Sequence, residues 1–192
     1  MKPILLLDMD DTTADLKHAW SRRILERHGF YTDPEKWTDW NLKNVLPREE
    51  AEAMYEVLRE PGFFRHLAPL PGAMAGIRTL HKHFHIIFLS KGDKYCYRDK
   101  HEWIEEHFPF LPPDHHLILT GRKDCVIGDY FVDDAPHNLY QSPARTKIVF
   151  DAPWNRHVTE FPRVRNWREL VNLLLSLEGL AGESREPAVS CV

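Results

Sequence analysis

Short apolar runs alternate along the chain with segments that carry apolar residues every three or four positions. The runs are too short for helices and are typical of buried strands. They predict strands at 3–9, 85–89, 115–119, 130–133 and 146–150. The helical patterns fall between and after them, at 72–83, 99–108, 136–141 and 167–177. Such alternation predicts an α/β fold, a parallel sheet flanked by helices with right-handed crossovers.

The interval between the first two predicted strands breaks this rhythm. Residues 15–71 are too many for one crossover, carry two helical patterns and are rich in aromatic residues. We therefore expect a small helical cap, inserted after the first strand, that roofs the sheet. The core would then comprise 1–14 and 72–178. Residues 179–192 lack apolar periodicity and are predicted to form a disordered tail.

Composition narrows the classes of function. With a net charge of −4 over 192 residues, we expect neither a nucleic-acid polymer nor a membrane as partner. No run approaches the ~18 apolar residues of a membrane span. Cys96, Cys125 and Cys191 are unpatterned, which favours a reducing, cytoplasmic location. The oligomeric state stays open, with a homodimer as one alternative.

Acidic residues gather where the first predicted strand ends. The apolar run 4–7 is followed by Asp8, Asp10 and Asp11. Clustered carboxylates repel one another and resist desolvation, so they favour a divalent cation among them. An EF-hand loop is excluded, because its required glycine would fall on Thr13.

A second acidic pair, Asp133 and Asp134, ends the apolar run 130–132. Neighbouring parallel strands end at the same edge of a sheet, so the two carboxylate sets are expected to converge. Ser90 ends another predicted strand, and Lys100 begins a predicted helix. A hydroxyl followed by free backbone N–H groups suits a phosphate, and the lysine is explained if it faces that anion. Taken alone, both also fit an ordinary loop and surface.

In this order, the motifs resemble those of the haloacid dehalogenase-like (HAD) phosphatase superfamily. Residues 8–12, DMDDT, match its DxDx[TV] motif, and Ser90, Lys100 and the pair 133–134 match the three motifs that follow. Within the superfamily the chain is similar to bacterial 5′(3′)-deoxyribonucleotidases. The similar strings are PGFFRHL at 61–67, DKHEWIEEHFPFL at 99–111, LTGRKD at 119–124 and DYFVDDAPHNL at 129–139. The resemblance implies a HAD-like, Rossmann-like sheet with a cap.

The resemblance also implies a reaction, the Mg²⁺-dependent hydrolysis of (deoxy)ribonucleoside monophosphates. Asp8 would attack the phosphorus and form an aspartyl-phosphate, with Asp10 as general acid and base. Mg²⁺ would be held by Asp8, Asp133 and the backbone carbonyl of Asp10. Ser90 and Lys100 would bind the phosphate oxygens.

A pocket for the nucleobase is expected in the cap. Phe63, Phe64, Trp37 and Trp40 are candidates to stack on a base, although aromatic residues also form the core of so small a cap. Phe63 is the preferred candidate, because it lies in the family-like string PGFF. Asp134 would orient Lys100 or the surroundings of the metal, without ligating it. Asp11 stands where related chains often have glycine, and it adds negative charge near the site.

Other classes of function stay open. A phosphatase with the same chemistry could act on a non-nucleotide phosphomonoester, because the cap decides specificity. A phospho-accepting signalling module shares the carboxylates, the hydroxyl and the lysine, but not the aromatic insertion. A non-catalytic binder of metal and nucleotide is a further alternative.

Two smaller interpretations concern basic residues. The histidines raise the alternative of a zinc site, but no cysteine or acid completes a set at the usual spacing. The histidines concerned are His81, His83, His85, His115 and His116. Arg122 and Lys123 are candidates to steer phosphate or substrate, but a solvated loop is the preferred interpretation.

Overall fold

Parallel strands form the core sheet in the computed structural model, which describes residues 1–92 and 94–180. The sheet has the strand order β3-β2-β1-β4-β5-β6. The strands are β1 (Ile4–Leu7), β2 (His85–Ser90), β3 (Leu117–Leu119), β4 (Tyr130–Asp133), β5 (Thr146–Phe150) and β6 (Arg163–Val164). The first five confirm the predicted strands. The pattern misses β6 because two residues are too few to show a period.

The helices of the core follow the predicted pattern. They are α3 (Ala73–Leu80), α4 (Tyr97–His107), α5 (Pro113–His116), α6 (Pro136–Gln141) and α7 (Trp167–Leu177). The helix α5 was not predicted, because its residues overlap the start of the strand expected at 115–119. Proline at 113 favours the first turn of a helix, and this turn delays β3 to Leu117. Two short 3₁₀ turns of the core, η3 (Lys123–Cys125) and η4 (Pro153–Asn155), are central to the site below.

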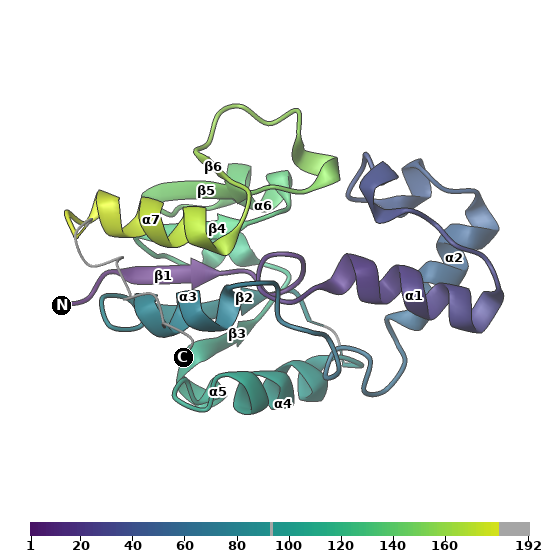
Figure 1. Ribbon diagram of the computed structural model, residues 1–192, viewed down its shortest axis with the longest axis horizontal. Coiled ribbons are helices and arrows are strands. Elements are labelled where there is room, and N and C mark those ends of the chain that lie inside the picture. Colours follow the sequence, from purple (N-terminus) through teal and green to yellow (C-terminus); the bar gives the residue numbers. More distant parts are fainter. Residues whose placement is uncertain (93, 181–192) are drawn as a thin grey trace, which may run out of the picture.

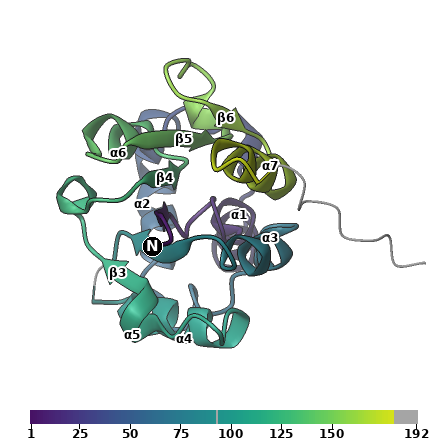
Figure 2. The ribbon, with the colours of Figure 1, turned by 90° about the vertical axis from the view of Figure 1, so that its left-hand side faces the viewer.

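Helices cover both faces of the sheet, which explains why β1 and the central parts of β2, β4 and β5 are apolar on both faces. Figure 2 shows α3 and α7 on one side of the strands and α6 on the other. Successive residues of β1 point to opposite faces of the sheet. On one face, Leu5 and Leu7 pack in the larger hydrophobic core, which also contains Trp103 and Trp167. Leu6 joins a smaller core with Leu139 of α6.

The cap is inserted after β1, as expected, and projects beyond the carboxyl ends of the strands (Figure 1). It contains α1 (Leu16–His28), η1 (Pro34–Lys36), η2 (Leu42–Asn44) and α2 (Arg48–Val57). The segment that enters the cap and the segment that returns to the core lie side by side: Leu70 N donates to Thr13 O at 2.8 Å. Trp20 forms the centre of the cap, with ring contacts to Trp37 at 5.7 Å and Tyr55 at 5.6 Å.

The end of the described chain is packed against the core. After α7, Leu180 N donates to Leu175 O at 2.7 Å, and the Leu180 side chain lies against the larger hydrophobic core. The expected disordered tail, 179–192, therefore begins too early by at least two residues. Its remaining part, 181–192, lies outside the described residues.

Candidate active site

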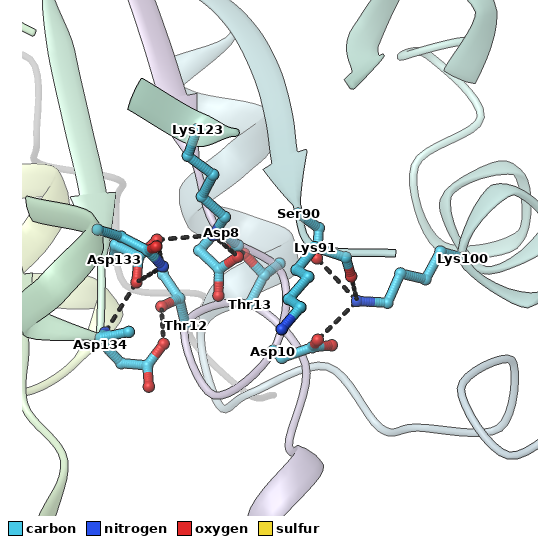
Figure 3. Close-up of polar contacts among 12 residues, drawn as sticks. Asp8, Asp10, Thr12, Thr13, Ser90, Lys91, Lys100, Lys123, Asp133 and Asp134 are labelled. Atoms are coloured by element: carbon cyan, nitrogen blue, oxygen red, sulfur yellow. Dashed lines mark hydrogen bonds and ion pairs between the residues drawn. The ribbon is translucent and has the colours of Figure 1, made fainter. Parts of the chain in front are cut away.

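Three carboxylates converge where β1 and β4 end side by side. The strands pair in parallel up to Leu7 and Val132, so Asp8, just after β1, and the pair Asp133-Asp134, at the end of β4, lie at the same edge of the sheet (Figure 3). One oxygen from each carboxylate lies within 4.8 Å of the others. All three side chains are buried. This confirms the expected convergence of the two acidic motifs.

Lys123 lies between two of these carboxylates. Its Nζ donates to Asp8 Oδ1 at 2.5 Å and to Asp133 Oδ2 at 2.7 Å, and the residue is only 5% exposed. The expectation of a solvated loop for Lys123 is wrong, because η3 turns this side chain inward at the end of the sheet. Arg122, its neighbour, is exposed as expected. The family-like string LTGRKD contains Lys123 and was the one available signal.

A second group of contacts surrounds Lys100, in the first turns of α4. Its Nζ donates to Asp10 Oδ2 at 2.6 Å, to Ser90 Oγ at 2.7 Å and to Lys91 O at 3.0 Å. Lys100 and Ser90 are buried, whereas the Asp10 side chain is 25% exposed. The three sequence-predicted residues therefore lie together (Figure 3), and Lys100 faces Asp10 rather than Asp8 or Asp134.

The loop after β1 is held in place by hydroxyls. Thr13 Oγ1 donates to Asp8 O at 2.8 Å. Thr12 Oγ1 reaches Asp134 Oδ1 at 3.5 Å, and Trp154 Nε1 donates to Asp134 Oδ2 at 2.9 Å. Asp134 thus takes its side-chain partners from the loop after β1 and from η4 rather than from Lys100, which corrects the expected orientation of Lys100 by this carboxylate.

Burial raises the pKa of several carboxyl groups in the site. For Asp8, burial and the neighbouring Asp133 outweigh Lys123, which acts in the opposite direction. For Asp10, burial raises the pKa against the opposing charge of Lys100. The pKa of Asp134 lies well above its usual range, because of burial and then the charge of Asp133. Such a set needs added positive charge to ionise fully.

The chemistry of these donors fits Mg²⁺. The three converging groups are all carboxylates, the hard oxygen ligands that Mg²⁺ prefers. The one lysine among them, Lys123, contacts Asp8 and Asp133 but not Asp134, so the cluster retains negative charge. A divalent cation would stabilise the ionised carboxylates against the burial and the mutual repulsion that raise these pKa values.

Asp11 has a structural part in the loop. Its φ of 56° is left-handed, the conformation that glycine adopts most easily. The Asp11 carboxylate accepts the backbone N–H of Lys17 at 2.8 Å, so it caps the start of α1, where Asp15 makes no side-chain cap. This bond explains how a non-glycine residue is tolerated here.

A cavity of about 790 Å³ lies between the site and the cap. Asp8, Asp10 and Lys123 line its core end. Its aromatic lining comprises Trp20, Trp37, Trp40, Tyr55, Phe64 and Trp154. Of the predicted stacking residues, Trp37, Trp40 and Phe64 line the cavity, and the preferred candidate Phe63 does not. Trp37, Phe63 and Phe64 also belong to the hydrophobic core.

Trp40 lines the cavity and contacts the core. Its ring meets the His137 ring at 4.7 Å, and Lys91 Nζ lies 5.7 Å from the ring centre. Both partners belong to the core, so Trp40 is a point of contact between cap and core. Being 44% exposed, it also keeps surface available to a ligand.

The histidines do not form a metal site in the described part of the chain. The His85 and His116 rings lie 5.2 Å apart, but the one group of three candidate ligands found there is the carboxylate cluster. Among the residues that the structure describes, no helix is long and apolar enough to cross a membrane.

Comparison with solved structures agrees with this fold. A HAD family hydrolase from Deinococcus radiodurans, solved with phosphate and sodium, superposes with a TM-score of 0.61 at 12% identity, covering 93% of this chain and 97% of that one. A HAD hydrolase from Bacillus subtilis, bound to magnesium, gives 0.58 at 13%, covering 90% and 98%. These similarities define the class: the chain has the HAD-like hydrolase fold.

Sequence comparison places the chain within that class. A 5′(3′)-deoxyribonucleotidase of Clostridium acetobutylicum is 33% identical over 177 residues, covering 92% of this chain and 97% of that one. One of Bacillus subtilis is 30% identical, covering 91% and 100%. Residues 2–179 match the family described as 5′ nucleotidase, deoxy (Pyrimidine), cytosolic type C protein. The chain belongs to this family of HAD-type phosphatases.

Proposed function

We propose that this protein hydrolyses deoxyribonucleoside monophosphates to nucleoside and phosphate, with Mg²⁺ as cofactor. The observation that carries the proposal is the convergence of Asp8, Asp133 and Lys123 beneath an aromatic cavity. Family membership supports the nucleotide as substrate. The same membership, in a family described as cytosolic, supports a cytoplasmic location.

Asp8 is the nucleophile in this proposal. Its carboxylate attacks the phosphorus in line, an acyl phosphate forms on Asp8, and the P–O bond to the nucleoside breaks. Lys123 holds the carboxylate through Oδ1, which leaves Oδ2 for the attack. We assign Lys123, rather than Lys100, to the lysine motif of the superfamily, because Lys123 contacts the nucleophile.

Asp10 transfers the protons. It protonates the departing nucleoside oxygen and then removes a proton from the water that attacks the acyl phosphate, which releases phosphate and restores Asp8. Its raised pKa, caused first by burial, favours the protonated form that the first step needs. Lys100 holds Asp10 by Oδ2 at 2.6 Å and fixes its position.

Mg²⁺ would be held by Asp8, Asp133 and the backbone carbonyl of Asp10, with Asp134 close enough to take part. When bound, it neutralises the phosphate and the carboxylates so that two anions can approach each other. Lys100 and the Ser90 hydroxyl lie next to Asp10, where we propose that they bind phosphate oxygens.

The cavity is the proposed binding site of the substrate. Phosphate binds at the core end, and the base lies among the aromatic residues of the cap, with Trp40 and Trp37 as the proposed stacking partners. Each base stack contributes roughly 1–3 kcal/mol. A cap of this lining favours a nucleotide over a sugar phosphate.

The test is a phosphate-release screen of the purified protein. It compares deoxyribonucleoside and ribonucleoside monophosphates, sugar phosphates and p-nitrophenyl phosphate, each with Mg²⁺ and with EDTA. We expect the highest kcat/KM for deoxyribonucleotides and none above background in EDTA or for Asp8→Asn. A preference for sugar phosphates would point to a non-nucleotide phosphatase, and a stable phosphoprotein without turnover to a signalling module.

A further inference from the structure

Trp154, on the η4 turn, faces the second carboxylate of the acidic pair. Its Nε1–H donates to Asp134 Oδ2 at 2.9 Å, and the two residues are only 6% and 4% exposed. The other oxygen, Oδ1, has the Thr12 hydroxyl at the longer distance of 3.5 Å. The indole N–H is therefore the closer of the two side-chain donors that fix this carboxylate.

The η4 turn is braced against the end of β4. Asn155, which has no exposed surface, donates through Nδ2 to Asp134 O and to Phe150 O, both at 2.7 Å. Its Oδ1 accepts from Ala152 N at 3.1 Å and from Arg163 Nη1 at 2.7 Å. All four hydrogen-bonding positions of this amide are thus occupied. The frame holds the adjoining indole at a fixed place relative to the carboxylate.

Asp134 is held by neutral donors, which is a costly arrangement for a buried carboxylate. In the described part of the chain, no ion pair joins it to a lysine or arginine, and Lys123 contacts Asp8 and Asp133 instead. Indole and hydroxyl donors orient the charge without neutralising it. The arrangement suits a carboxylate that is to be offered to a cation.

We propose that Trp154 is a positioning residue that orients the Asp134 carboxylate toward the Mg²⁺ held at Asp8 and Asp133. The inference rests on the proposed function, because it needs magnesium at the acidic cluster. Trp154 acts through Asp134. Removing a donor that hydrogen-bonds to a metal ligand typically weakens metal binding 10–100-fold.

The variant Trp154→Phe tests this role, because it removes the N–H and keeps an aromatic ring. Trp103→Phe is the matched control. Trp103 is as deeply buried, and its Nε1 donates to a backbone carbonyl, Leu67 O, at 2.7 Å. Both variants lose one buried indole hydrogen bond, but only the first loses a bond to a carboxylate of the site.

Mg²⁺ binding to the substrate-free protein is measured by calorimetry. We expect roughly tenfold weaker binding for Trp154→Phe and wild-type affinity for Trp103→Phe. In parallel, ¹⁵N–¹H spectra record the indole N–H signals, and the signal missing from Trp154→Phe identifies Trp154. In the wild type this signal should shift when Mg²⁺ is added, since its acceptor is the carboxylate beside the cation.

The outcomes separate the inference from the proposed function. Equal Mg²⁺ affinity for wild type and Trp154→Phe would overturn the positioning role, as would an equal loss in Trp103→Phe. A Trp154 indole signal that does not shift when Mg²⁺ is added would also overturn the positioning role. A wild-type protein that binds no Mg²⁺ would instead refute the proposed function, and the positioning role with it.

Discussion

Replacing Lys123 by methionine removes the positive charge between two buried carboxylates. The Lys123 Nζ contacts Asp8 Oδ1 at 2.5 Å and Asp133 Oδ2 at 2.7 Å, with side chains 5%, 7% and 0% exposed. Removing one partner of a buried ion pair leaves an uncompensated charge, which typically lowers stability by about 3–5 kcal/mol. For a chain of this size, the loss corresponds to a decrease in Tm of roughly 6–20 °C.

The assay is urea or thermal unfolding of wild type and Lys123→Met, first in EDTA and then in Mg²⁺. In EDTA we expect the full loss of stability. Added Mg²⁺ should restore more stability to the variant than to the wild type, because the metal then supplies the charge that lysine supplied. Turnover in Mg²⁺ should fall as well, since Lys123 holds the nucleophile.

Lys17→Met is the matched control for this experiment. Lys17 also pairs with a carboxylate, Glu35, at 3.1 Å, but Glu35 is 52% exposed. Pairs open to solvent contribute at most about 1 kcal/mol. If Lys123→Met in EDTA unfolded at the wild-type urea concentration, or lost no more than Lys17→Met, the proposed charge compensation at Asp8 and Asp133 would be refuted.

Three further variants or conditions test the site. Asp8→Asn should lower kcat by several decades, measured as phosphate release, whereas Asp10→Asn should slow turnover and leave Mg²⁺ binding by calorimetry largely unchanged. Trp40→Ala should raise KM for deoxyribonucleotides roughly tenfold, the equivalent of one lost base stack, and affect sugar phosphates less. Burial raises the pKa of Asp8, Asp10, Asp11 and Asp134, so these four groups bind more protons in the metal-free folded state than in the unfolded state. Their share of the free energy of unfolding in EDTA, measured for Asp134 as the difference between wild type and Asp134→Asn, should therefore fall as pH rises above about 4, and a difference that rises with pH would contradict the burial of this group.

The sequence predicted the sheet well because its strands are strongly patterned. β1, β2, β4 and β5 are apolar on both faces, and this shows as short uninterrupted runs. The convergence of Asp8 with Asp133 followed from one rule, that neighbouring parallel strands end at the same edge. It needed no knowledge of the loops.

The lysines show where this reasoning ends. Lys123 and Lys100 both lie outside strands, and nothing local distinguishes a lysine that turns inward from one in solvent. η3 brings Lys123 to Asp8, 115 residues away along the chain, while α4 brings Lys100 to Asp10. The choice of Phe64 over Phe63 for the cavity is of the same kind, since adjacent residues in a turn differ only in direction.

The sequence by itself determined the order of elements, the inserted cap and the two acidic motifs, because hydrophobic periodicity and strand ends are local properties. Tertiary structure alone decided which lysine meets the nucleophile, which aromatic residue lines the cavity, and that Trp154 holds Asp134. These contacts join segments far apart in the chain. They depend on how loops and turns pack against the sheet, and no local pattern records that packing.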